Sequence, residues 1–304
     1  MHWSIRGCAM AEAVTFESTI QEAETYFAPR RRFRIRSLPP RFKFGAVGVL
    51  VTLLAAIFLP IILHSDPYQL NADAILLAPS ANAPMGTDAF GRSVLSRVLL
   101  GMRTTYEIGI SVCLLTFVVG GGLGLITGYV RQVDLILMRI VDAIMAIPSI
   151  MIALATVTVF GPSALNTILV ISLFLTPRTI RVMRSAVFGV KEAMYIEAAR
   201  ALGVSHSRVL LRHIFPNALS PLIIQQTFVL AFAVLGEAAL SFIGVGVPPP
   251  TPTLGNILSD AQQVLQQAPW VSIFPGALIA VIVMSVNTLG DGIRDWLDVH
   301  IRDI

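Results

Sequence analysis

The chain has 304 residues, of which 55% are hydrophobic and 13% are charged, and its formal net charge is +4. Soluble domains carry about 25% charged residues, so this composition is typical of a membrane protein and not of a soluble domain. The two cysteines, Cys8 in a polar stretch and Cys113 in an apolar one, are not expected to meet, so we predict no disulfide.

Residues 1–43 form a polar tail, which carries acidic residues first and then a basic run: Arg30, Arg31, Arg32, Arg34, Arg36, Arg41 and Lys43. The tail shows neither the apolar region nor the small-residue cleavage site of a secretory signal. An arginine run can bind nucleic acid, but its position directly before an apolar stretch favours a role in topology or lipid contact. Met10 is an alternative start to Met1, and the sequence does not decide between them.

The first membrane span is predicted at residues 44–64, because Phe44–Leu63 is a run of about 20 apolar residues. The basic residues before it place its first end in the cytoplasm. Residues 65–104 then form a periplasmic segment. Its arginines, Arg92, Arg97 and Arg103, run against the preference of basic residues for the cytoplasmic side. We therefore expect part of this segment to form a helix on or near the membrane surface.

The second span, Thr105–Val130, contains Gly120, Gly124 and Gly128 at intervals of four. Glycines with this spacing form one groove along a helix, which lets a neighbouring helix pack closely. A phosphate-binding loop is the alternative for this glycine-rich stretch, but no Gly-Lys-Ser/Thr follows and the surroundings are apolar. The pattern favours helix packing and gives no support for ATP hydrolysis by this chain alone.

Two further spans are predicted in the apolar region between Leu135 and Thr176, which is about twice as long as one membrane crossing requires. Gly161-Pro162 is the expected turn between a third span at about 135–160 and a fourth at about 163–181. Asp142 lies within the third span, where a charged residue is a candidate for the translocation pathway. An intrahelical pair with Arg139, three residues earlier, is the favoured alternative.

A basic loop follows the fourth span, with Arg178, Arg181, Arg184, Lys191, Arg200, Arg208 and Arg212 against Glu192 and Glu197. This excess of basic residues predicts a cytoplasmic position. We expect one short helix at about 188–202 that Gly203 closes in the left-handed conformation. Ser205 or Ser207 then caps a second helix, which Pro216 ends. Small residues before Gly203 would let another surface approach the backbone, as a docking element requires.

The fifth span is predicted at about Leu222–Ile243 and contains Gln225, Gln226 and Glu237. Glu237 must face other helices or water, so lining the pathway and forming an interhelical hydrogen bond are equally favoured. A proline-rich outer loop around Pro248–Pro250 is unsuited to a helix or a central strand. The sixth span, Ser272–Leu289, is followed by a cytoplasmic C-terminus at 292–304.

The basic loop carries a family resemblance. The spacing of Glu197-Ala198-Ala199, Gly203 and Pro216 resembles the EAA loop of permease subunits of bacterial ATP-driven (ABC) importers. Other motifs resemble the dipeptide/oligopeptide/nickel branch, which has the type I importer fold: Gly86-Thr87-Asp88, Gly91-Arg92, Ser96-Arg97, Arg212–Asn217, Leu240–Gly244 and Gly290–Asp295. There are two departures: Ser93 replaces the usual acidic residue after Gly-Arg, and His213 replaces an apolar residue of the general loop pattern.

The resemblance implies an all-α polytopic membrane protein with six transmembrane helices and a cytoplasmic coupling helix. The ABC importer transmembrane domain would cover residues 101–291, with a coupling loop at about 186–217. The residues that contact the ATPase would be Glu197, Ala198, Ala199, Gly203 and Pro216. The chain would form half of the translocation pathway for peptides or similar small solutes such as nickel. It would be a non-catalytic subunit of the bacterial inner membrane, with both termini in the cytoplasm.

The implied partners are a second homologous permease subunit, two ATP-binding subunits, a periplasmic or lipid-anchored solute-binding protein and membrane lipid, with no nucleic acid. ATP and Mg²⁺ would be bound by the ATPases, and this chain would hold no cofactor or metal. The alternative is a secondary transporter or channel not coupled to ATP, which predicts an internal repeat and broken helices. A membrane enzyme would need clustered catalytic groups, and the five histidines form no such cluster in the sequence.

Overall fold

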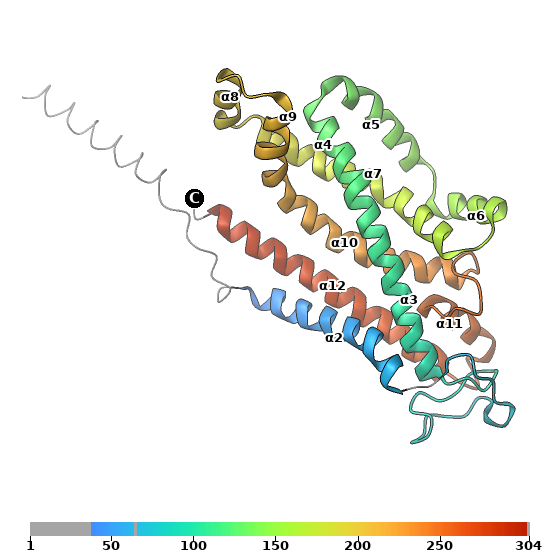
Figure 1. The fold of residues 1–304 in the computed structure, drawn as a ribbon. Coiled ribbons are helices and arrows are strands. Elements are labelled where there is room, and N and C mark those ends of the chain that lie inside the picture. Colours follow the sequence, from blue (N-terminus) through green and yellow to red (C-terminus); the bar gives the residue numbers. More distant parts are fainter. Residues whose placement is uncertain (1–37, 64–65, 303–304) are drawn as a thin grey trace, which may run out of the picture.

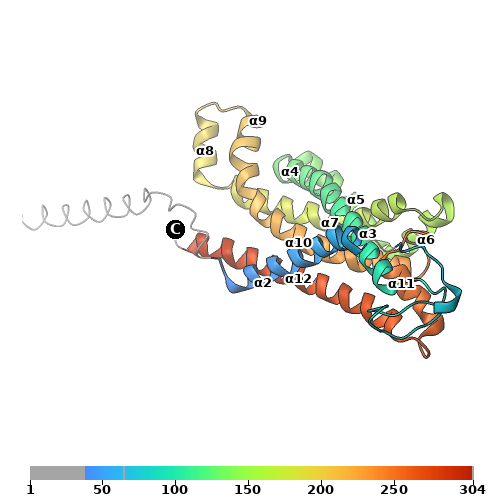
Figure 2. The ribbon, with the colours of Figure 1, turned by 60° about the horizontal axis from the view of Figure 1, so that its bottom comes forward.

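The computed structural model describes residues 38–63 and 66–302, and within these ranges the chain is almost entirely helical, with no β-strand. The helices pack into one bundle (Figures 1 and 2). In the part of the chain that the structure describes, five helices are long and apolar enough to cross a membrane, and a bent pair of helices brings the number to six if it counts as one span. The predicted all-α fold with six spans is therefore confirmed. The basic run at Arg30–Arg36 lies outside the described residues.

The first span is α2 (Pro40–Leu63), which lies antiparallel along the last helix, α12 (Trp270–Arg302) (Figure 1). Glycines permit their close approach, because a Cβ atom on Gly48 or Gly292 would collide with Ser285 or Phe42. Both helices are continuous, as expected from their apolar runs. The sixth span is longer than predicted at both ends, and the helix continues through the predicted C-terminal segment to Arg302.

The second span begins earlier than predicted. Helix α3 (Val94–Leu115) continues through a π-helical turn at Thr116–Gly120 into α4 (Gly121–Tyr129). Part of the segment 65–104 is helical, as expected: apart from a 3₁₀ turn at Ala72–Ala74, this helical part is the start of α3 and so continues directly into the second span. Arg92 and Arg97 pair with Asp88 of the same segment and with Asp260 of the segment 254–261, so their charges are neutralised within the protein.

The third span is not one straight helix. It consists of α5 (Arg131–Ala146) and α6 (Ser149–Phe160), which are bent by 85° relative to each other. Pro148 explains the break, because a proline disfavours the helical conformation of the residue before it. Ile147 is accordingly extended, with φ −90° and ψ 128°. The expected continuous span at 135–160 is wrong in this respect.

Two long helices extend beyond their predicted spans at the same end of the bundle. Helix α7 (Ala164–Lys191) begins at the predicted turn, where Ser163 accepts a hydrogen bond from the Asn166 N–H, and it runs ten residues past Arg181. The helix of the fifth span is continuous from His206 to Phe242 through α9 (His206–Arg208), a π-helical turn at Val209–Ile214 and α10 (Phe215–Phe242). Between them α8 (Met194–Ala201) stands clear of the bundle (Figures 1 and 2).

The opposite end of the bundle carries the loops between residues 66 and 93, the proline-rich segment after α10, and α11 (Leu254–Ala261) (Figure 1). The proline-rich segment contains no helix or strand, as predicted. A 3₁₀ turn at Gln262–Val264 leads from α11 toward α12. The two ends therefore differ: one carries the predicted coupling loop, and the other carries a platform of loops around one short helix.

Candidate functional site

The predicted coupling loop consists of a helix, a glycine corner and a second helix, but its first helix starts later than expected. Residues 188–191 belong to α7, and the extended Ala193 (φ −70°, ψ 136°) separates them from α8. The expected single helix at 188–202 is therefore wrong. The break lets α8 bury Ile196, which packs with Val209 and Ile214 in one apolar cluster.

Gly203 closes α8 in the left-handed conformation, with φ 77°. The N–H of Gly203 donates to the Arg200 carbonyl (2.9 Å), and the N–H of Val204 donates to the Ala199 carbonyl (3.1 Å). This pair of hydrogen bonds is the Schellman motif, which satisfies the last carbonyls of a helix and favours glycine. No atom lies within 4 Å of the position that a Cβ atom on Gly203 would take. Glycine is thus required here for its backbone conformation and not for lack of space.

Pro216 does not end the second helix, contrary to expectation. It lies in the first turn of α10, directly after the π-helical turn at Val209–Ile214. A proline has no N–H to donate, and the wider π-helical turn before it accommodates this loss within a continuous helix. Ser205 precedes α9 as predicted, although its side chain makes no capping hydrogen bond.

Tyr129, at the end of α4, holds the loop against the bundle. Its hydroxyl lies 2.6 Å from Nδ1 of His206, and its carbonyl accepts a hydrogen bond from Lys191 Nζ (3.1 Å). The guanidinium group of Arg200 lies 5.5 Å from the centre of the Tyr129 ring, within the range of a cation–π interaction. The loop is thus attached to α4, to the end of α7 and to the long helix that follows it.

The outer face of α8 is exposed and largely apolar. Met194 is 81% exposed and Leu202 is 85% exposed, with the small Ala198 between them on the same helical face. Glu197 and Gly203 are also exposed, whereas Ala199 is half-buried. Among the described residues the side-chain carboxylate of Glu197 has no hydrogen-bond or ion-pair partner, and its backbone N–H donates to the Ala193 carbonyl. Large apolar side chains that project from a bundle beside an unpaired carboxylate are typical of a surface that docks onto another protein.

The three glycines of the second span face α7. A Cβ atom on Gly124 would lie 2.6 Å from Met183 Cβ and 2.8 Å from the Ile180 carbonyl oxygen. A Cβ atom on Gly128 would lie 2.5 Å from Val187 Cβ, and one on Gly120 would lie 2.9 Å from Thr179 Cβ. The helices therefore meet along the predicted groove. This contact connects α4, which carries Tyr129, to the helix that leads into the coupling loop.

The buried carboxylate of Glu237 joins two helices. It is fully buried and accepts hydrogen bonds from Thr105 of α3 (2.9 Å) and from Ser241 (2.7 Å). Gln226 accepts a hydrogen bond from the Thr116 hydroxyl (3.1 Å). Of the two roles left open for Glu237, the geometry favours the interhelical hydrogen bond.

Asp142 forms an ion pair with Arg181 of α7 (2.6 Å), so the expected intrahelical pair with Arg139 is wrong. The bend after Ala146 lets α5 lie against α7, and Asp134 of α5 also pairs with Arg184. Both carboxylates thus act between helices. Sequence spacing identifies neighbours within one helix, but it does not show which helices will be adjacent.

Several charged and polar residues line a cavity of about 640 Å³ between α7, α10 and α12. Its polar lining residues are Arg178, Gln225, Asn287 and Asp291. Of these, only Gln225 is a candidate pathway residue from sequence, because the sequence places Arg178 in the basic loop and Asp291 at the cytoplasmic end. The sequence does contain a signal for a pathway role of Arg178, because this residue comes almost directly after the apolar stretch of the fourth span.

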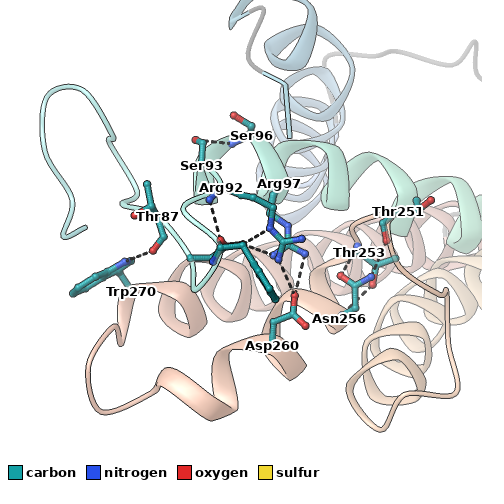
Figure 3. Close-up of polar contacts among 12 residues, drawn as sticks. Thr87, Arg92, Ser93, Ser96, Arg97, Thr251, Thr253, Asn256, Asp260 and Trp270 are labelled. Carbon is teal, nitrogen blue, oxygen red and sulfur yellow. Dashed lines mark hydrogen bonds and ion pairs between the residues drawn. The ribbon is translucent and has the colours of Figure 1, made fainter. Parts of the chain in front are cut away.

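The motifs at the opposite end form a network of ion pairs (Figure 3). The buried carboxylate of Asp88 accepts hydrogen bonds from Arg92 (2.7 Å) and Arg97 (2.7 Å), and Arg97 also reaches Asp260 of α11 (3.1 Å). Ser93 is the N-cap residue of α3. The contiguous residues 88–97 are thereby held to α11, which is distant in sequence, and the two segments form a platform. Among the described residues, no three His, Cys, Asp or Glu side chains form a group that could hold a metal ion.

Comparisons with known proteins agree with this architecture. Residues 120–303 match the family described as binding-protein-dependent transport system inner membrane component. The chain is 39% identical over 260 residues to the dipeptide transport system permease protein of Alkalihalophilus pseudofirmus, which covers 84% of this chain and 86% of the relative. It is 35% identical over 266 residues to the di/tripeptide transport system permease protein of Pseudomonas aeruginosa, and this match covers 85% of this chain and 88% of the relative.

Two further similarities come from a relative and a solved structure. The glutathione transport system permease protein of Pectobacterium atrosepticum is 34% identical over 264 residues, covering 84% of this chain and 87% of the relative. An inward-facing structure of the MetNI methionine ABC transporter matches with a TM-score of 0.54 at 19% identity, covering 68% of this chain and 96% of that chain. At this identity the structural match concerns the fold.

Proposed function

Because this chain belongs to the family of inner membrane components of binding-protein-dependent transport systems, and is therefore a non-catalytic permease subunit of an ABC transporter, we propose that it forms half of an import pathway for short peptides. The single observation that carries the proposal is the exposed face of α8. The apolar side chains of α8 project away from the bundle. The apolar surface of the bundle itself would face lipid and a second permease. An ATPase subunit is the expected occupant of this face.

The coupling mechanism follows from how the loop is attached. Ile196 and the contacts of Tyr129 join α8 to α4, α7 and the long fifth helix. Closure of two ATPase subunits, which bind ATP and Mg²⁺, would move α8 as a rigid handle and swing these helices together. The coupling residues in this proposal are Glu197, Ala198, Ala199 and Gly203. Pro216 lies outside the docking face and acts at the start of α10.

Short peptides are proposed as the solute because the named relatives are permeases for dipeptides, di/tripeptides and glutathione. A solute-binding protein would deliver the peptide to the platform at the end opposite α8. The complex would contain this chain, a second homologous permease and two ATPases. Family membership leaves no support for a secondary transporter or channel that works without ATP.

The test of the proposed function is import by the whole complex. Proteoliposomes that contain this chain, its partner permease and both ATPases should take up radiolabelled dialanine only when ATP and the solute-binding protein are both present. Uptake without ATP would point to a secondary transporter. ATP-dependent transport with no uptake of any short peptide would exclude peptides as the solute.

We propose that the coupling-loop end and both termini lie in the cytoplasm. This end carries Arg208 and Arg212, which form no ion pair with any other described residue, whereas Arg92 and Arg97 at the other end are neutralised by Asp88 and Asp260. Basic residues prefer the cytoplasmic side, but arginines whose charge is neutralised by an ion pair can lie on the outer side. Arg92 and Arg97 are therefore compatible with a periplasmic position.

Cysteine labelling tests this orientation in intact cells, in a chain whose Cys8 and Cys113 are replaced by serine. Ser80→Cys on the loop platform should react with an impermeant thiol reagent, and Ser207→Cys should react only after the membrane is permeabilised. Both positions are exposed on the protein, so the side of the membrane on which each lies decides whether it is labelled. Labelling of Ser207→Cys in intact cells would contradict the orientation.

A further inference from the structure

The cavity between α7, α10 and α12 is partly open to the surface, and its lining combines charged, amide and aromatic side chains. Its volume of about 640 Å³ lies within the ~300–1,000 Å³ that small-molecule sites usually occupy. One part of its wall is aromatic, with Phe228 and Phe232 of α10. Arg178 comes from α7, and Asn287 and Asp291 come from α12, so three helices contribute to one lining.

The cavity lies along the middle of α7 and of the fifth-span helix and beside the later part of α12, where Asp291 is exposed. Arg178 stands at the middle of α7, and Gln225 stands at the middle of the continuous helix from His206 to Phe242. Gly290 allows α12 to pack directly on α10, because a Cβ atom there would collide with Thr227. This contact brings Asn287 and Asp291 to the side of α10 that Arg178 also faces.

Two opposite charges remain unpaired in this lining. Among the described residues neither Arg178 nor Asp291 forms an ion pair, although Arg181 and Arg184 on the same helix are both paired with aspartates. The guanidinium group of Arg178 lies 5.3 Å from the centre of the Phe232 ring, which holds it over the aromatic wall. Unpaired charges inside membrane-spanning segments are costly, and they usually mark a pathway for an ion or a polar solute.

We propose that Arg178 and Asp291 bind the two ends of a short zwitterionic peptide during its passage. The guanidinium group of Arg178 takes the peptide carboxylate, and the carboxylate of Asp291 takes the peptide ammonium group. The amides of Gln225 and Asn287 are available to the peptide backbone, and the aromatic wall contacts the side chains. This inference rests on the proposed function, which it extends from a pathway to a binding site with defined recognition.

The same cavity has a second conceivable occupant, a side chain of the partner permease. Such a contact would make Arg178 and Asp291 assembly residues and would leave no role in recognition. The two occupants can be distinguished by measurement. If a peptide binds here, the loss of uptake caused by a substitution depends on whether the matching end of the transported peptide is charged. If a side chain of the partner permease binds here, the loss does not depend on the peptide.

The experiment crosses two substitutions with blocked peptides in the reconstituted complex. Uptake is measured for radiolabelled dialanine, for its C-terminal amide and for its N-acetyl form, each at saturating occupancy of the solute-binding protein. Arg178→Gln should lower dialanine uptake about tenfold, the effect of losing one charge-assisted hydrogen bond, and should not lower uptake of the amide further. Asp291→Asn should likewise lower dialanine uptake about tenfold and should not lower uptake of the N-acetyl peptide further.

Arg181→Gln is the matched control, because Arg181 lies one turn further along α7, pairs with Asp142 and does not line the cavity. It should lower uptake of all three peptides equally or not at all. If Arg178→Gln and Asp291→Asn also lower all three equally, or if either variant prevents assembly, the binding site is excluded while peptide import stands. If the wild-type complex imports neither dialanine nor any other short peptide, the proposed function itself fails.

Discussion

Replacement of Gly124 by leucine should prevent assembly of the complex while the chain still inserts into the membrane. The new side chain would start 2.6 Å from Met183 Cβ and 2.8 Å from the Ile180 carbonyl oxygen, so α4 and α7 would have to separate. Overpacking a helix interface costs about 1–3 kcal/mol, so we expect the yield of assembled complex to fall roughly tenfold. Copurification of the ATPases with the tagged permease, normalised to permease in the membrane, measures this yield.

Gly122 supplies the matched control. It lies two residues before Gly124 in the same helix, it is exposed, and a Cβ atom there would meet nothing within 4 Å. Gly122→Leu should therefore assemble normally, although it makes the same chemical change. Equal yields from the two variants would show that the close contact between α4 and α7 is not required.

Replacement of Gly203 by valine should abolish solute-stimulated ATP hydrolysis in an assembled complex. Valine disfavours the left-handed conformation that the Schellman motif requires at φ 77°, and the cost for a residue with a Cβ atom is about 1–2 kcal/mol or more. The corner would reopen and turn α8 away from the ATPase, although the spans are unchanged. ATP hydrolysis by the reconstituted complex, with peptide-loaded binding protein present, is the measurement.

Gly203→Asn separates backbone conformation from side-chain size. Asparagine adopts the left-handed conformation far more readily than valine, and the space around Gly203 is empty. We expect this variant to retain most of the stimulated hydrolysis. Equal loss in both variants would mean that a side chain at this position blocks the ATPase surface directly, and the conformational explanation would be wrong.

Glu197→Ala should produce the same loss for a different reason. The carboxylate is exposed in this chain alone and has no partner among the described residues. If it pairs with a basic group in an ATPase cleft, its removal typically costs about 2–5 kcal/mol. A solvated glutamate with no such role would tolerate alanine with little effect. Binding of the solute-binding protein at the opposite end should be unchanged in this variant.

Much of the architecture could be predicted because the membrane imposes simple rules on length and polarity. Runs of about 20 apolar residues identified the spans, and the four-residue spacing of Gly120, Gly124 and Gly128 identified a face that now lies against α7. The left-handed conformation at Gly203 was also predictable, since glycine after a short run of helix-forming residues is a common closing signal.

Several of the errors share one physical cause, which is contact between different elements of the fold. The break before α8 depends on burial of Ile196 by residues of the following helix. The partners of Arg97 and Asp142 lie on other elements, Asp260 on α11 and Arg181 on α7. Sequence spacing describes only neighbours within one helix, so it could not identify these pairs. The bend at Pro148 is different, because the local rule for a residue before proline was sufficient to predict it.

The measurement that tests the central claim most directly is the ratio of ATP hydrolysis rates with and without peptide-loaded binding protein. It is determined in the reconstituted complex for the wild type, Glu197→Ala and Gly203→Val, each checked for assembly. The coupling role of α8 predicts a ratio well above one for the wild type and a ratio of one for both variants, with binding protein still docked. If both assembled variants keep the wild-type ratio, residues 197–203 do not couple this permease to its ATPases.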